Sequence, residues 1–365
     1  MKKYKEKGNS FMNGQITPIE LKVKDGLTAT ASLKQNNKFA CITNSLTFAF
    51  ASIDEKLHVT CKIIDENSPG SAYAGVFGAD ESGRFMWCKS GLREAIMVDS
   101  ELKKVIRKMA SFNGNTFINA FLSIVAKDKF VYCSVNEAEG PQTFSVFDFT
   151  QDDPVAKIEK LYFCFILKKQ EDSCLIVSYD KKNQKTWKNA VLLKTDIAFL
   201  PDDDLTKELT DRQFQYGVHQ RAFNFLKNII IGEMAIDKWP EPFSVRWNAD
   251  KTDIKIEPII LQCPKPDDFA DNWEFSLDGK WCINKCIRNR ETPNEYRAIV
   301  FYQVNDSFPN GLSMPIYGGI TSEENKGCFI NQDVLGPLYL DIPPDGKPVV
   351  YKLNQIPELL KNLAR

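Results

Sequence analysis

The residue types that most often carry acid–base chemistry are unevenly supplied in this sequence. Histidine, the commonest general base and metal ligand, occurs only at His58 and His219, whereas aspartate and glutamate together number 48. His58 lies in an alternating, strand-like segment and His219 beside an apolar stripe, so we interpret both as structural or surface histidines. A nucleophile activated by histidine is therefore not expected, and no catalytic residue is assigned. A mechanism that uses two carboxylates, as in glycoside hydrolysis, stays open.

The short motifs that carry a known mechanism are missing from the sequence. It contains no G-x-S-x-G nucleophile elbow, no phosphate loop of the G-x-x-x-x-G-K-[ST] type, no H-E-x-x-H and no G-x-G-x-x-G. The ten cysteines are scattered, and the only close pair is Cys282 and Cys286. Because a structural zinc site needs four ligands, usually as two short-spaced pairs, the sequence predicts no metal site and no cofactor.

Two groups of side chains are candidates for binding a partner. The first consists of tryptophans in or near expected loops, where an exposed indole could stack on a sugar or anchor another protein: Trp239, Trp247 and Trp273. The second is a basic cluster on the polar face of a helix expected at residues 101–112: Lys103, Lys104, Arg107 and Lys108. The alternative for the tryptophans is a filling role between sheets. The alternative for the basic cluster is an ordinary solvated helix face.

Composition and charge narrow the class of protein. The chain has 365 residues and a net charge of −1, so no overall basic field is available to attract nucleic acid. Hydrophobic residues make up 43% of the chain, yet no uninterrupted apolar stretch is long enough to span a membrane. The lysine-rich N-terminus lacks the apolar segment of an export signal. We therefore expect a cytoplasmic protein with reduced cysteines that binds neither nucleic acid nor membranes.

A polar turn followed by a new apolar strand recurs at a nearly constant interval. The first copies end at Lys38, Arg84, Lys129 and Ser173, which are 46, 45 and 44 residues apart. A hairpin that repeats every ~45 residues leaves room for about four short strands, which is the blade period of a β-propeller. The sequence therefore predicts a mainly β, propeller-like fold of six or seven blades. The alternatives are a β-sandwich and a multi-sheet α+β arrangement.

Later copies of the turn are less regular, ending at Lys251, Lys280 and Lys347. The short interval from 251 to 280 favours the interpretation that Lys251 belongs to a different strand pair of its blade. Around Lys280, the segment Phe275-Ser-Leu-Asp-Gly-Lys-Trp281 resembles the hairpin of TolB-type propeller repeats, which carry Phe-Ser-Pro-Asp-Gly-Lys before an aromatic or apolar residue. Leucine stands here where those repeats have proline. The resemblance implies a blade architecture and a binding role, and it carries over no catalytic residue.

Three segments have the apolar spacing of helices. They are residues 101–112, residues 211–231, and residues 356–363, which have a proline in their first turn. Because the second segment follows an acidic, helix-starting stretch, we expect a helical insertion at residues 197–237. The insertion would lie within a single propeller-like domain that spans residues 1–365.

These observations favour a non-enzymatic protein that presents a partner-binding surface on a propeller-like framework. The motivating features are the repeated hairpins, the expected insertion and the missing catalytic motifs. Two other classes stay open: a carbohydrate-active hydrolase that uses paired carboxylates, and a structural subunit of a larger assembly. The sequence does not identify the protein partner.

Overall fold

The structure of the chain is a computed structural model. It describes residues 14–24, 26–33, 35–45 and 48–65, the strands bounded below with residues 227 and 259, and residues 269–289, 292–308, 310–322 and 327–363. Within these residues there are twenty-seven strands, one 3-10 helix and one α-helix. The mainly β composition expected from the alternating sequence is thus confirmed.

The described strands form six antiparallel sheets, and the seven-stranded one contains two groups that share β13. The strands thus fall into seven groups, here called blades 1 to 7. Blade 1 contains β2 (Leu27–Ser32), β3 (Lys38–Thr43), β4 (Phe48–Ile53) and β5 (Val59–Asp65). Blade 2 contains β6 (Ala74–Ala79), β7 (Phe85–Lys89), β8 (Ala95–Asp99) and β9 (Lys104–Lys108). Blade 3 contains β10 (Leu122–Ala126), β11 (Lys129–Val135), β12 (Gln142–Asp148) and the first part of β13 (Ala156–Gln170).

The remaining blades follow in chain order. Blade 4 contains the second part of β13, β14 (Ser173–Asp180), β15 (Thr186–Leu192) and β16 (Ile197–Phe199). Blade 5 contains β17 (His219–Asn224), β18 (Ile229–Ile236), β19 (Trp239–Trp247) and β20 (Ile254–Pro258). Blade 6 contains β21 (Phe269–Phe275), β22 (Trp281–Arg288), β23 (Tyr296–Gln303) and β24 (Ile316–Thr321). Blade 7 contains β25 (Cys328–Gln332), β26 (Gly336–Asp341), β27 (Val349–Lys352) and the N-terminal strand β1 (Ile19–Glu20).

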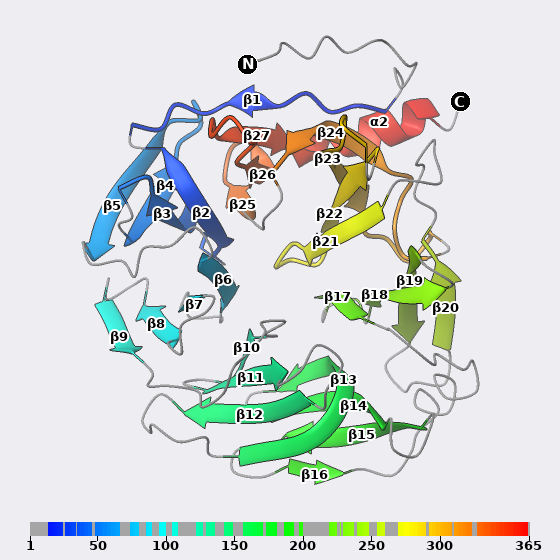
Figure 1. Ribbon diagram of the computed structural model, residues 1–365. Coiled ribbons are helices and arrows are strands. Elements are labelled where there is room, and N and C mark those ends of the chain that lie inside the picture. The colour runs from blue at the N-terminus through cyan, green and yellow to red at the C-terminus, as the bar shows by residue number, and fades with distance from the viewer. Residues whose placement is uncertain are drawn as a thin grey trace.

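The blades are arranged in a ring (Figure 1). The first strands of neighbouring blades contact one another, as β25 does with β2, β2 with β6, β6 with β10, and β17 with β21. These first strands therefore lie innermost, and the later strands of each blade lie farther out. Blades 3 and 4 share β13, whose residues up to Leu161 pair with β12 and whose residues from Tyr162 pair with β14.

The first four of the repeated turns lie at matching points of successive blades, as predicted. The strands that follow the first four turns begin at Lys38, Phe85, Lys129 and Ser173, and each is the second strand of its blade or, for blade 4, the strand after β13. The turn near residue 251 falls between β19 and β20, the third and fourth strands of blade 5. The interpretation of the short interval as a different strand pair is therefore confirmed.

The hairpin between β21 and β22 shows why its sequence favours a tight turn. Ser276 Oγ donates to Asp278 Oδ1 at 2.6 Å, and the same carboxylate oxygen accepts from the Lys280 amide at 3.1 Å. Gly279 sits between them at a φ of +68°, in the left-handed region that a side chain with a Cβ atom disfavours.

We expect Gly279→Ala to lower the free energy of unfolding by about 1 kcal/mol, because alanine is strained at this positive φ. Chemical denaturation measures the change. Gly279→Asn is the matched control, since asparagine tolerates the left-handed region and should cost less. Equal stabilities for the wild type and the alanine variant would contradict the expectation.

Two of the three predicted helices are wrong. Within 101–112 the structure has β9, and within 211–231 it has β17 and the start of β18. The described parts of the helical insertion expected at 197–237 are strands of blades 4 and 5. Residues 200–218 lie outside the described residues. The neighbouring strands supply hydrogen-bonding partners along β18, and this outweighs the local spacing of apolar residues, three or four apart, that predicts a helix. The β-branched run Ile229-Ile230-Ile231 also suits a strand. The C-terminal helix is confirmed as α2 (Ile356–Leu363).

Residues near both termini complete the ring. β1 forms the outer strand of blade 7 by pairing with β27, and the segment before it pairs with β24 of blade 6, where the Ile16 amide donates to the Tyr317 carbonyl at 2.8 Å. After β1, Lys22 forms a parallel bridge with His58 of blade 1. Residues 14–24 thus contact three blades, and Figure 1 shows β1 running along their outer side. α2 follows the 3-10 helix η1 (Leu353–Gln355) and packs on β24.

Candidate functional site

The three candidate tryptophans do not form one surface. Trp273 lies in β21 with 5% of its surface exposed, in the core between blades 5 and 6, and its ring centroid is 5.6 Å from that of Tyr302. Its role is therefore to fill the space between sheets, the alternative considered for it. Trp239 and Trp247 are the first and last residues of β19. Since a strand rises about 3.3 Å per residue, they stand roughly 26 Å apart at opposite ends of blade 5.

The basic cluster lies on a strand and not on a helix. Lys104, Arg107 and Lys108 belong to β9, the outermost strand of blade 2, while Lys103 lies outside the described residues. The structure therefore places the cluster in a different blade from every candidate tryptophan. Of the two histidines, His58 is an exposed residue whose Nδ1 lies 3.2 Å from Asp54 Oδ2, as expected for a surface histidine, and His219 begins β17.

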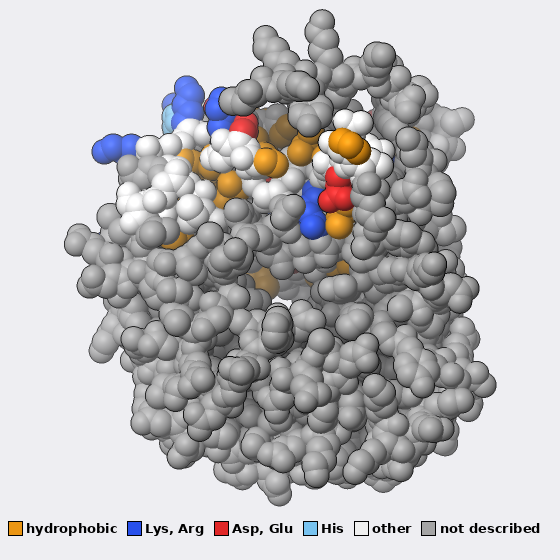
Figure 2. All heavy atoms as spheres, viewed as in Figure 1, with side chains coloured by type: hydrophobic (Ala, Val, Ile, Leu, Met, Phe, Trp, Pro, Cys, Tyr) orange, Lys and Arg blue, Asp and Glu red, His pale blue; other side chains and the backbone are white. Residues whose placement is uncertain are grey.

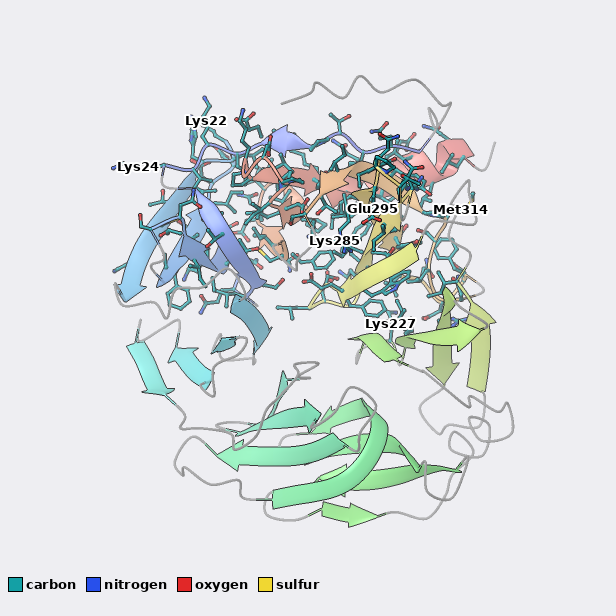
Figure 3. The ribbon with its side chains drawn as sticks, viewed as in Figure 1. Lys22, Lys24, Lys227, Lys285, Glu295 and Met314 are labelled. Carbon is teal, nitrogen blue, oxygen red and sulfur yellow. The ribbon has the colours of Figure 1, made fainter. Side chains whose placement is uncertain are left out.

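The most distinctive chemistry in the described residues was not predicted from the sequence. All eight residues of β22 are buried, and their side chains alternate between two interfaces. Cys282 and Cys286 face blade 5, whereas Trp281 and Ile283 face blade 7. Lys285 shares the second face and carries a charge into the seam between blades 6 and 7, as Figure 3 shows.

Lys285 is neutralised by an aspartate of the neighbouring blade. Its Nζ lies 3.0 Å from Asp341 Oδ1 at the end of β26, and both side chains have 0% exposure. Thr321 Oγ1, at the end of β24, donates to the same oxygen at 2.9 Å. Asp341 Oδ2 has no hydrogen-bond partner among the described residues. The ion pair joins the two blades, because its members are 56 residues apart and belong to different sheets.

A second carboxyl group faces this pair. Glu274 pairs with Ile283 across β21 and β22, so its side chain lies on the face of blade 6 that meets blade 7. Burial raises the pKa of Glu274 to about 8; Lys285 acts in the opposite direction, and Asp341 raises the value further. At neutral pH the seam therefore contains a neutral Glu274 beside a charged Lys285–Asp341 pair.

Aromatic side chains enclose the polar groups. Phe301 of blade 6 meets Tyr339 and Tyr351 of blade 7 at centroid distances of 5.8 and 4.8 Å. Gly327 leaves room for the Tyr339 hydroxyl, because a Cβ at this position would overlap it. Burial raises the pKa of Tyr339 well above its ordinary value, so this hydroxyl stays protonated. The wall of aromatic rings separates the ion pair from water.

This cluster has the ingredients of acid–base chemistry, but the ion pair within it has no exposed surface. Burial holds Glu274 protonated near neutrality, whereas the Asp341 carboxylate pairs with Lys285, and both members of this pair have no exposed surface. Among the residues that the structure describes, no group of three histidine, cysteine, aspartate or glutamate side chains is arranged to hold a metal ion. The Lys285–Asp341 pair therefore has a structural role, because it joins blades 6 and 7 within the wall of the ring.

The described outer surface carries charge over blade 1 and the N-terminal segment. Figure 2 shows lysine side chains and one histidine at its upper left, and Figure 3 labels two of the lysines, Lys22 and Lys24. The acidic Asp54 and Glu55 are exposed nearby. The surface is therefore mixed in sign, in keeping with the near-zero net charge of the chain.

Comparison with solved structures identifies the architecture. The β-propeller domain of Cps50 (Swd1) from Myceliophteria thermophila matches 92% of this chain and 99% of that domain, with a TM-score of 0.53 and 10% sequence identity. The chain is a β-propeller. Hydrazine synthase from Kuenenia stuttgartiensis is also similar, with a TM-score of 0.50, 9% identity and 78% of each chain covered. At these identities the matches describe the fold of the propeller alone.

No family model matches the propeller, and no curated protein matches it by sequence. Among the described residues, no helix has the length and apolar character needed to cross a bilayer.

Proposed function

We propose that the chain is a non-enzymatic, cytoplasmic interaction scaffold built on one propeller domain that spans residues 1–365. The observation that carries the proposal is the burial of the Lys285–Asp341 pair, because the cluster best suited to chemistry is enclosed between two blades. A framework of this kind offers its outer strands and loops to a partner. The hydrogen-bonded Ser276–Asp278 turn supports kinship with TolB-type repeats, although proline is replaced there by Leu277.

The partner surface that we propose is the edge of blade 2, where Lys104, Arg107 and Lys108 lie on the outermost strand. Basic residues on an edge strand would suit an acidic protein segment. Trp239 and Trp247 are proposed contacts at the two ends of blade 5.

A native affinity capture with crosslinking, repeated at several salt concentrations, tests the scaffold proposal. We expect a stoichiometric protein partner whose recovery falls with salt and is lost in the Lys104→Glu/Arg107→Glu variant. Lys24→Glu, on the N-terminal segment near blade 1, is the matched control and should retain the partner. If no partner is recovered at any salt concentration, or if both variants retain it equally, the proposal fails.

A carbohydrate-active hydrolase is the second candidate, because the protonated Glu274 lies in the same seam as Asp341, which pairs with Lys285. Such a pair resembles an acid and a base of glycoside hydrolysis, but Asp341 has no exposed surface. Turnover of a broad panel of chromogenic glycosides, lost in Glu274→Gln, would favour this candidate over the scaffold. A role as a subunit of a larger assembly predicts a partner-dependent mass in size-exclusion chromatography with light scattering.

A further inference from the structure

The seam between blades 6 and 7 is joined at several levels. The main chain of residues 14–16 pairs with β24, and the Tyr317 amide donates to the Gly14 carbonyl at 2.9 Å. Leu363 of α2 approaches Gly14, and α2 belongs to the same apolar cluster as Phe329 and Tyr351 of blade 7. Residues near both termini therefore hold the seam in which Lys285 and Asp341 are buried and Glu274 is partly exposed.

The charge balance at this seam depends on one proton. The titratable groups that act on Glu274, or feel its charge, come from three strands: Cys282 and Lys285 on β22, Cys328 on β25, and Tyr339 and Asp341 on β26. Lys285 is the one cation among them, and Asp341 already neutralises it at 3.0 Å. With Glu274 protonated the group is neutral; with Glu274 ionised it holds one uncompensated negative charge in a low-dielectric interior.

A buried charge without a partner is unfavourable, and water or rearrangement must relieve it. Glu274 offers a route for this relief, because it lies on the innermost strand β21 and its side chain is partly exposed. Asp341 Oδ2 is an oxygen in the same seam that has no hydrogen-bond partner among the described residues. Ionisation of Glu274 would also draw Lys285 away from Asp341 and so weaken one of the contacts that join the blades.

We propose that the seam between blades 6 and 7 is a proton-controlled closure, in which a proton on Glu274 keeps the two blades together and its loss admits water and loosens them. The device does not depend on the proposed scaffold role. It would make the integrity of the ring fall as the pH rises from about 4.5 to about 8.

The direction of the pH effect on the closed seam follows from the linkage between proton binding and closing. The pKa of Glu274 is about 8 in the closed seam, against 4.5 for an ordinary glutamate. The closed seam therefore binds the proton more tightly than the open seam. The free energy by which protonation of Glu274 favours the closed seam is fully present below about pH 4.5. The advantage falls as the pH rises toward 8 and does not change further above that value.

Hydrogen exchange measured by mass spectrometry at pH 6.5 and 8.5 tests the closure, with labelling times scaled to the intrinsic exchange rate. We expect peptides from β21, β22, β25 and β26 to open at least about tenfold more often at pH 8.5, whereas peptides from β3 and β4 of blade 1 change little. Glu274→Gln mimics the protonated side chain, and this variant should lose the pH dependence at the seam.

Glu295→Gln is the matched control, because Glu295 is an exposed glutamate in the turn between β22 and β23 of the same blade (Figure 3). This variant should keep the wild-type response. The proposal is overturned if the corrected exchange of the seam is independent of pH in the wild type. It is also overturned if Glu274→Gln responds to pH as the wild type does. Both outcomes leave the scaffold function to be judged by the capture experiment.

Discussion

Lys285→Met is expected to lower the free energy of unfolding by about 3 to 5 kcal/mol, because Asp341 would be left as a buried charge without a cation. Methionine fills a similar volume and suits the apolar neighbours Trp281 and Ile283, so the loss reports mainly on charge. Urea denaturation followed by tryptophan fluorescence measures it. The pKa of Glu274 should also rise further, since Lys285 is the group that lowers it.

A double-mutant cycle separates the ion pair from its surroundings. Asp341→Asn alone should also be strongly destabilising, because it leaves the Lys285 cation unpaired. The double variant Lys285→Met/Asp341→Asn removes both charges, so its loss should be well below the sum of the two single losses. Additive losses, or a loss under about 1 kcal/mol for Lys285→Met, would show that the buried pair does not join the blades.

The parts of the fold that the sequence predicts are those fixed by local rules. Turn residues that favour positive φ, such as Asn37 at +61° and Gly279 at +68°, mark the point where the first strand of a blade turns into the second. The first four turns recur every 44 to 46 residues, and this interval gives the blade period without any long-range contact. The final helix was found for the same reason, since Pro357 and the apolar stripe of α2 lie within one segment.

The errors come from residues whose environment is set by distant partners. The apolar spacing of residues 211–231 is compatible with a helix. In the structure, however, β18 pairs with β17 on one side and with β19 on the other. The sequence places Trp273 in or near a loop. In the structure it lies in β21, which pairs with β22, and its ring contacts that of Tyr302.

The candidate seam was missed for a related reason. Lys285 interrupts an otherwise apolar alternation with Ile283 and Ile287, which is a signal that a charged residue needs a buried partner. The identity of that partner is non-local, because Asp341 is supplied by the next blade.

Deletion of residues 1–24 is expected to lower the free energy of unfolding by on the order of 5 kcal/mol. The segment buries Ile16 and Leu21, which are 1% and 4% exposed, and each aliphatic side chain of this size contributes about 1.5 to 3 kcal/mol. The deletion also removes β1 and the main-chain bonds to Tyr317 and Pro348. A loss of this size approaches the whole stability of an ordinary domain, so thermal unfolding should shift by many degrees.

The control is a chain that begins at Gly14, which keeps every described contact of the segment and should unfold as the full chain does. The longer deletion has a second consequence, because β27 becomes an unpaired edge that invites association with other chains. Size-exclusion chromatography should therefore show oligomers only for that variant. A synthetic peptide of residues 14–24, added in trans, should suppress them and restore part of the stability, since it can pair again with β24 and β27. If the longer deletion is as stable and monomeric as its control, blades 6, 7 and 1 hold the ring together without this segment, and the prediction is wrong.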